Sequence, residues 1–267
     1  YGEIGTEKAV SYALEAAKFQ AVSGLSAETK RKLDILRGGL VLPAPTKEGA
    51  AAELSTIATK LNSTYGKGKG TLNGNAINGS DIEAAMGTNR NPEELKEMWT
   101  SWHDNVGKPM GKDYARMVEI ANEGANELGF KDVGAMWRSG YDMPADDFAK
   151  LTDKLWLEVK PLYDELHTYT RNKLNAKYGD AVQPKTGPIR ADLLGNMWAQ
   201  QWNGIYDIVA PPKSDPGFDL NKVLVQKKYD PLKMVKTGEG FYTSLGLPAL
   251  PETFWQRSLI TRPRDRE

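Results

Sequence analysis

The sequence contains no cysteine, only two histidines and no excess of charge of either sign. Without cysteine the chain has no disulfide, no thiolate-bound zinc, no iron–sulfur cluster and no thiol nucleophile. The two histidines, His103 and His167, are too few for a metal site built from histidine alone. The 35 basic and 35 acidic residues balance, which disfavours long-range attraction to nucleic acid or to an anionic membrane surface. No apolar run is long enough to span a bilayer.

Apolar residues recur at helical spacing along almost the whole sequence, whereas strand-like alternation is hard to find. The predicted fold class is therefore all-α. A glycine and lysine run at 66–70 lacks the spacing of a phosphate loop and predicts a flexible turn. We expect helices at about 6–23, 27–38, 47–64, 81–88, 92–105, 111–128, 131–139, 145–178, 188–210, 219–228 and 231–245, with a last element from Pro251.

Two helix starts have the spacing of capping boxes. Ser80 pairs with Glu83 in the first, and Asn91 pairs with Glu94 in the second, which Pro92 strengthens.

The longest predicted helix begins after Pro144 and ends at Gly179, and Pro161 should kink it. It carries one apolar stripe, with His167 beside the stripe as an ordinary surface or boundary histidine. The stripe consists of Phe148, Leu151, Leu155, Val159, Leu162, Leu166 and Tyr169.

The segment 188–210 has an unusual composition for a helix. Its large aromatic residues are Trp198, Trp202 and Tyr206. Uncharged amides recur by four and three at Asn196, Gln200 and Asn203. Solvated helix faces usually carry charges, so amides beside aromatic rings suit a cleft wall that orients a polar ligand. The alternative is a buried polar network that bonds to neighbouring backbone.

Standard catalytic arrangements are absent from the sequence. Neither His103 nor His167 is followed by Glu, so no His-Glu-x-x-His zinc motif exists. No Gly-x-Ser-x-Gly elbow accompanies a histidine. From its residues alone, the chain is a helical body with one amide and aromatic face and no catalytic centre.

Four blocks of sequence nevertheless resemble the angiotensin-converting enzyme family, the peptidyl-dipeptidase A zinc metallopeptidases. They are WRSGYDMP, LWLEVKPLYDELHTYTRNKLNAKYG, GPIRADLLGNMWAQQWNGIYDIV and FYTSLGLPALPETFWQRSLI, in the family's order. The resemblance runs from about Leu95 to Glu267, and the absence of cysteine together with the Gly/Asn-rich stretch 66–80 is similar to bacterial members.

The resemblance implies a multi-helix array that forms the first half of a two-lobed zinc peptidase with a deep cleft. We expect lid-region helices in 1–90 and cleft-wall helices in 91–267. In the family the zinc lies on a His-Glu-x-x-His helix beyond the segment that matches Glu267. The expected chain is thus truncated at both ends, without metal ligands or catalytic residues, and inactive as it stands.

Site residues follow from the resemblance position by position. Gln200 matches the glutamine whose amide binds the C-terminal carboxylate of the peptide substrate, with Asn196 and Trp198 as supports. Tyr141 matches a tyrosine that lines a chloride site. His103 stands where a second chloride site has arginine, and a histidine is cationic only near or below its pKa, which disfavours chloride there.

For the intact parent, the resemblance implies a zinc-dependent dipeptidyl carboxypeptidase that acts on oligopeptides with a free C-terminus. It also implies a periplasmic or secreted bacterial location, with the C-terminal half of the same enzyme as partner and chloride as a further ion. The alternative is a non-catalytic helical module that binds peptides or another protein.

Overall fold

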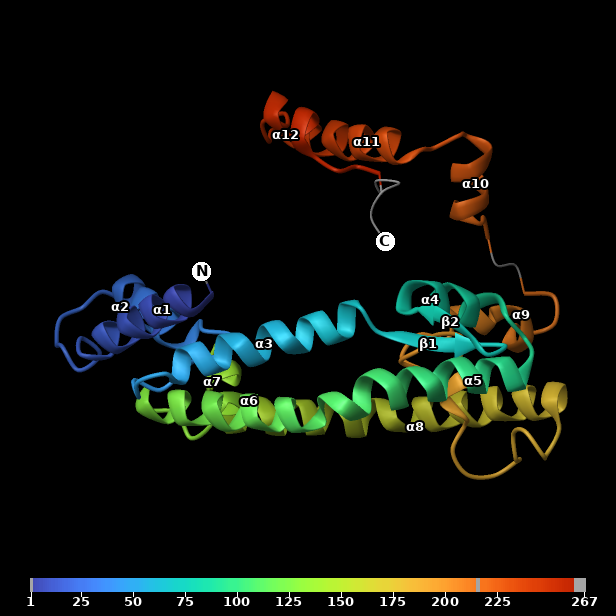
Figure 1. The fold of residues 1–267 in the computed structure, drawn as a ribbon, viewed down its shortest axis with the longest axis horizontal. Helices are drawn as coiled ribbons and strands as arrows, with labels where there is room; N and C mark the ends of the chain where they lie inside the picture. Colours follow the sequence, from blue (N-terminus) through green and yellow to red (C-terminus); the bar gives the residue numbers. More distant parts are fainter. Residues whose placement is uncertain (1, 215–216, 262–267) are drawn as a thin grey trace. The chain divides into compact units, whose positions relative to one another are not determined.

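The computed structural model describes residues 2–214 and 217–261 of the chain. Its contacts divide the chain into two units, Tyr1–Ala210 and Pro211–Glu267, each described here by itself. Helices make up both units, with one short hairpin as the exception among the described residues (Figure 1). The all-α prediction is therefore confirmed.

The helices of the first unit agree with most of the predicted ranges. They are α1 (Gly2–Ala17), α2 (Ala27–Gly38), α3 (Ala50–Gly66), α4 (Gly79–Thr88), α5 (Pro92–Trp102), α6 (Lys108–Glu127), α7 (Val133–Arg138), α8 (Ala145–Tyr178) and the single turn α9 (Tyr206–Val209). A π-helical turn, η1 (His103–Gly107), joins α5 to α6, and two 3₁₀ turns, η2 (Ala191–Leu193) and η3 (Asn203–Ile205), precede α9.

The helix caps explain where several of these elements begin and end. The Ser26 side chain accepts from the Thr29 amide at the start of α2. Asn91 accepts from the amides of the first turn of α5, as predicted. The predicted cap at Ser80 is wrong, because the side chain of Asn78 accepts from the Asp81 amide and starts α4 two residues earlier. An asparagine cap satisfies a free amide of the first turn as well as a serine does.

A β-hairpin replaces the flexible turn predicted at 66–70. Strand β1 (Lys69–Leu72) pairs antiparallel with β2 (Asn75–Asn78) through Asn73 and Gly74, whose φ angles are 51° and 75°. Asn-Gly is the commonest pair at positive φ in a two-residue hairpin, and it was the signal missed. The Glu97 carboxylate on α5 accepts from the amides of both turn residues at 2.9 and 3.0 Å, and these bonds lower its pKa.

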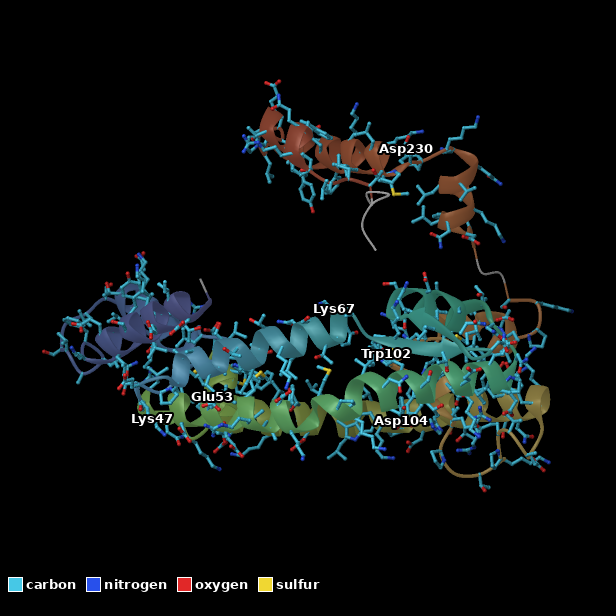
Figure 2. All side chains as sticks on the ribbon, in the orientation of Figure 1. Lys47, Glu53, Lys67, Trp102, Asp104 and Asp230 are labelled. Atoms are coloured by element: carbon cyan, nitrogen blue, oxygen red, sulfur yellow. The ribbon has the colours of Figure 1, made fainter. Side chains whose placement is uncertain are left out.

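The first unit has several hydrophobic clusters. The largest brings α4, α5 and η1 together with the end of α8 and residues 189–205. In a second, α6 packs against α3 through Ile120 and Leu54. Arg116 on α6 donates to Glu53 on α3 at 2.7 Å across the same pair of helices (Figure 2). The largest cluster is the one that surrounds the predicted site segment.

Helix α8 has the predicted length and ends at Gly179, which has a φ of 79°. Pro161 lies inside it. Its apolar stripe is largely uncovered in the described structure: Leu155 is 49%, Val159 53% and Leu162 74% exposed. The only buried residues of α8 are Thr170 and Leu174, near its C-terminal end.

The second unit contains α10 (Leu220–Gln226), α11 (Pro231–Ser244) and α12 (Glu252–Arg257). Asp219 and Asp230 cap the first two, close to the predicted starts. None of the described residues from 211 to 261 is buried. In the described parts of both units, no helix is both long and apolar enough to cross a membrane. The charged tail from 262 lies outside the described residues, and the predicted division into 1–90 and 91–267 stays a prediction.

Candidate functional site

The segment around Gln200 is not a helix, so the single helix predicted for 188–210 is wrong. Between η2 and η3 the backbone bends without regular hydrogen bonding. Gly195 and Ala199 have φ angles of 87° and 55°, in the left-handed region that ends a right-handed helix. The amides therefore share no helix face: Asn196 is buried, whereas Gln200 and Asn203 are exposed.

Side chains hold the backbone of this loop in place of helical hydrogen bonds. The Met197 amide donates to Glu83 Oε2 on α4 at 3.0 Å, and the Met197 carbonyl accepts from Trp99 Nε1 on α5 at 3.1 Å. The Trp198 amide donates to Asn196 Oδ1 at 3.2 Å. Both polar groups of the Met197 peptide segment are thus satisfied by side chains from two different helices, which fixes the loop to the largest core cluster.

Close backbone packing fixes the ends of the same loop. A Cβ on Gly195 would lie 3.0 Å from the backbone of Gly204, so only glycine fits between the two segments. Arg90 donates to the Gly204 carbonyl at 2.6 Å and to the Asp207 carboxylate at 2.8 Å. The hydrogen bond from Arg90 lowers the pKa of Asp207.

The Gln200 side chain is exposed and makes no hydrogen bond within 2–214 or 217–261. Its neighbours along the chain are held: the carbonyl of Ala199 accepts from Trp202 Nε1 at 3.0 Å. Gln200 therefore presents a free amide to solvent from a backbone that the fold restrains. The buried Asn196 accepts a hydrogen bond from the Trp198 amide within the same loop, and its role as a support stays a prediction.

Trp198 and His103 lie together, although they are 95 residues apart. The His103 ring stacks on Trp99 at 3.9 Å between centroids and meets Trp198 edge-on at 6.1 Å. Tyr65 at the end of α3 stacks on Trp198 at 6.4 Å. The rings of Tyr65, His103 and Trp198 line an open cavity of about 320 Å³. Its lining residues include Tyr65, Trp102, His103, Met110, Tyr114 and Trp198.

His103 opens the π-helical turn, and its ring is already engaged. Its Nδ1 lies 2.7 Å from the carbonyl oxygen of Trp99. The next residue, Asp104, is paired with Lys108 at 3.6 Å (Figure 2). The ring therefore has one nitrogen left for an anion.

Tyr141 lies elsewhere, in the turn between α7 and α8. Its ring stacks on Phe148 at 3.8 Å. It lines a separate open cavity of about 810 Å³ beside α2, where Arg31 is paired with Asp142 at 2.5 Å. The two cavities share no lining residue, so the structure does not bring Tyr141 and His103 into one site.

The residues described offer no place for zinc. No group of three or more His, Asp or Glu side chains in that part of the chain converges as metal ligands would. His167 instead lies among the rings of Tyr163 and Trp202, at 6.0 and 6.4 Å, which agrees with the prediction of a boundary residue.

Sequence reasoning missed Glu83 and Trp99 as parts of this site. Glu83 had been assigned to a capping box, and its partner Met197 is 114 residues away. Nothing local in the sequence marks such a contact.

A comparison with protein families matches the model for angiotensin-converting enzyme, peptidase family M2, over residues 3–267. The match includes residues 3–94, to which the resemblance seen in the sequence had not extended.

Angiotensin-converting enzyme of Bos taurus is 36% identical over 258 residues, which are 96% of this chain and 19% of that protein. The enzyme of Theromyzon tessulatum is 40% identical over 187 residues, 70% of this chain and 30% of that protein. The enzyme of Haematobia irritans exigua is 40% identical over 185 residues, which are 69% of this chain and 30% of that protein. The chain thus spans a fifth to a third of these relatives, and it belongs to the angiotensin-converting enzyme family.

Proposed function

We propose that the chain is part of a zinc-dependent peptidyl-dipeptidase, which releases C-terminal dipeptides from oligopeptides, and that Gln200 binds the C-terminal carboxylate of the substrate. The observation that carries the assignment is the exposed Gln200 amide, which lacks a protein partner in the described residues and stands on a restrained loop. Membership of the angiotensin-converting enzyme family supports the class of reaction.

A neutral amide suits this role. It donates to a carboxylate without carrying a charge that must be removed from water, and a hydrogen bond to a charged group contributes about 1.5–3 kcal/mol. Holding the free carboxylate at a fixed distance from the scissile bond sets the register of cleavage, so that a dipeptide is released. Asn196 and Trp198 act as supports, because Asn196 is bonded within the loop and Trp198 packs on Tyr65.

The zinc of the proposed enzyme would activate the water that attacks the peptide bond. The described residues do not fit a zinc ion, so the proposal places its ligands and the general base outside this chain. What this chain's own residues do is bind and orient the substrate C-terminus. We further propose that 1–90 forms the lid region and 91–267 part of the cleft wall.

The exposed stripe of α8 supports the proposed partner, the remaining half of the same enzyme. Large apolar side chains such as Leu155, Val159 and Leu162 are uncovered over several turns of one helix face. Contiguous apolar surface of this kind is normally covered by another protein surface. A periplasmic or secreted location belongs to the same proposal.

Chloride remains a proposal for two separate places. Tyr141 at the edge of the larger cavity could donate its hydroxyl to the ion, with Arg31 of that cavity already paired. At His103 we propose that chloride dependence is weak, because one ring nitrogen is occupied.

The test of the carboxylate assignment is Gln200→Ala in the full-length enzyme that contains this chain. We expect kcat/KM to fall by about tenfold or more on a peptide with a free C-terminus, as for the loss of one charge-assisted hydrogen bond. The same peptide with an amidated C-terminus should be affected much less. The matched control is Gln201→Ala, which removes the neighbouring exposed glutamine. Equal losses on both peptides would refute the assignment.

A second measurement separates the enzyme from a non-catalytic binding module. For the chain as given we expect no stoichiometric zinc and no hydrolysis of a blocked tripeptide, measured by metal analysis and chromatography of the products. For the full-length protein we expect both. A full-length protein that binds peptides without zinc and without turnover would establish the binding module instead.

A further inference from the structure

We infer that Glu83 is a positioning residue for Gln200: its carboxylate holds the Gly195–Gln200 loop at the Met197 amide and thereby aims the Gln200 side chain. The inference rests on the proposed function, since it names the residue that sets the orientation of the proposed carboxylate ligand. Glu83 itself touches no substrate in this proposal.

Helix α4 is a fixed platform for this contact. Ile82 and Met86, on either side of Glu83 along the helix, are fully buried in the largest core cluster. The Arg90 side chain, just beyond α4, is bonded to Gly87, Gly204 and Asp207. Glu83 therefore extends toward the loop from a helix whose backbone the core holds in place.

The contact itself is a direct hydrogen bond of ordinary length. Glu83 Oε2 accepts from the Met197 amide at 3.0 Å, between a half-buried side chain and a buried residue. Hydrogen bonds with an ionised acceptor are roughly twice as strong as neutral ones. The carbonyl oxygen of Met197 accepts from the neutral indole of Trp99. Glu83 is therefore the stronger of the two restraints on Met197.

A strained residue, Ala199, lies in the chain between Met197 and Gln200. Ala199 has a φ of 55°, a conformation that a residue with a Cβ adopts only when its surroundings impose it. Trp202 fixes the carbonyl of Ala199 from the C-terminal side. If the Met197 amide were released, Ala199 could relax to a negative φ, and the Gln200 side chain would point in another direction.

The experiment compares Glu83→Ala with Glu83→Gln in the full-length enzyme, on one peptide with a free C-terminus and on its amide. For Glu83→Ala we expect KM on the free peptide to rise about five- to tenfold with kcat nearly unchanged, and the amide to be unaffected. Glu83→Gln keeps an oxygen acceptor without the charge and should restore about half of the loss. A loss of stability alone would lower kcat on both peptides through the amount of active enzyme.

Glu97→Ala is the matched control. Glu97 is also a carboxylate that accepts from loop amides, those of Asn73 and Gly74, but it holds the β-hairpin rather than the Gln200 loop. We expect this variant to leave the ratio of KM values on the two peptides unchanged. A shift of that ratio as large as the one in Glu83→Ala would overturn the inference.

A second readout needs no enzymatic activity. Hydrogen exchange of the Met197 amide, measured by NMR on the chain itself, should be at least tenfold faster in Glu83→Ala than in the wild type, while exchange in the α6 core stays unchanged. Equal exchange rates at Met197 would overturn the inference, because Glu83 would then not hold the loop.

The double variant Glu83→Ala, Gln200→Ala separates the two hypotheses. We expect it to equal Gln200→Ala alone on the free peptide, because Glu83 acts through Gln200. If Gln200→Ala failed to distinguish the free peptide from its amide, the proposed function would fail. If Gln200→Ala distinguished them but Glu83→Ala did not, the positioning role alone would fail.

Discussion

Helix α8 and the segment 190–205 are both rich in large apolar side chains, yet they differ in backbone regularity and in side-chain burial. Helix α8 is regular over 34 residues, and its stripe is exposed, with Leu162 at 74%. The segment 190–205 has only isolated 3₁₀ turns, yet Leu193 and Ile205 are 1% and 2% exposed. In these two regions, therefore, regular secondary structure does not coincide with buried side chains.

The difference follows from where the backbone hydrogen bonds go. A helix satisfies its own amides and carbonyls except in its end turns, so the exposed middle of α8 needs no side-chain partner for its backbone groups. The loop cannot, and its polar backbone groups are bonded to side chains of α4 and α5 such as Glu83 and Trp99. The loop that carries Gln200 depends on other elements for its backbone hydrogen bonds, whereas α8 supplies most of its own.

The largest difference should come from truncating one leucine in each region, a buried one in the segment 190–205 and an exposed one on α8. Leu193→Ala removes a side chain that is 1% exposed and should lower the free energy of unfolding by about 2–5 kcal/mol. Leu162→Ala, on the exposed stripe, should change it by less than about 0.5 kcal/mol. Urea unfolding followed by circular dichroism measures both. Similar losses in the two variants would mean that the stripe is covered in solution.

A smaller effect should come from the backbone of the loop. Gly195→Ala places a methyl group 3.0 Å from Gly204 at a φ of 87°, and strain of this kind costs about 1–3 kcal/mol. Gly240→Ala is the control, because its methyl group would meet no atom within 4 Å in the described structure. The midpoint of thermal unfolding should fall for Gly195→Ala only. An unchanged midpoint would show that the loop adapts freely.

The ion pair between Arg90 and Asp207 should contribute less and depend on pH. Because Arg90 lowers the pKa of Asp207, the contribution is present above the unfolded pKa of about 4 and is lost as the pH falls through the lower folded pKa. The Asp207 side chain is 60% exposed and screened by solvent, so Asp207→Asn should cost about 0.5–1 kcal/mol at pH 7.

Urea unfolding of Asp207→Asn at a series of pH values tests this sign. The cost should shrink toward zero near pH 2. Asp153→Asn on exposed α8, where no ion pair is found among the described residues, should show no pH-dependent difference from the wild type. A cost that grows as the pH falls would contradict the assignment.

The smallest effect on stability should come from charges on the stripe. Leu155→Lys with Leu162→Lys should leave the unfolding free energy within about 0.5 kcal/mol, because both residues are exposed. The same pair should reduce self-association of the chain, which sedimentation velocity measures, since apolar patches promote it. Unchanged association would show that the stripe does not hold copies together.

Much of the fold could be predicted because it is encoded locally. Asn91 with Pro92 marks the start of α5, and Gly179 marks the end of α8, each through conformational preferences of single residues. The prediction of a helix over 188–210 was wrong because the structure of this segment is determined by distant contacts. Its residues suit a helix, but tertiary contacts of Met197 and Gly195 override that preference.

The residues of the candidate site also differ in whether they could be predicted from the sequence. Gln200 could be found from its sequence block, and the structure places it on the surface with a free amide, although its binding role stays a proposal. Glu83 could not be found, because its contact with Met197 spans 114 residues and needs the packed core. Trp198 and His103 likewise meet only in three dimensions.

The π-helical turn His103–Gly107 has a consequence for the alignment of α5 and α6. A π turn accommodates one residue more than an α turn, and each residue of an α-helix rotates the next side chain by about 100°. Deleting a single residue here would change the register of α6 relative to α5. Every later side chain of α6 would then rotate, and Ile120 would leave the cluster that it forms with Leu54. The extra residue of the π turn thus sets which face of α6 meets α3. A one-residue deletion within the turn should therefore lower the stability of the fold more than most substitutions nearby.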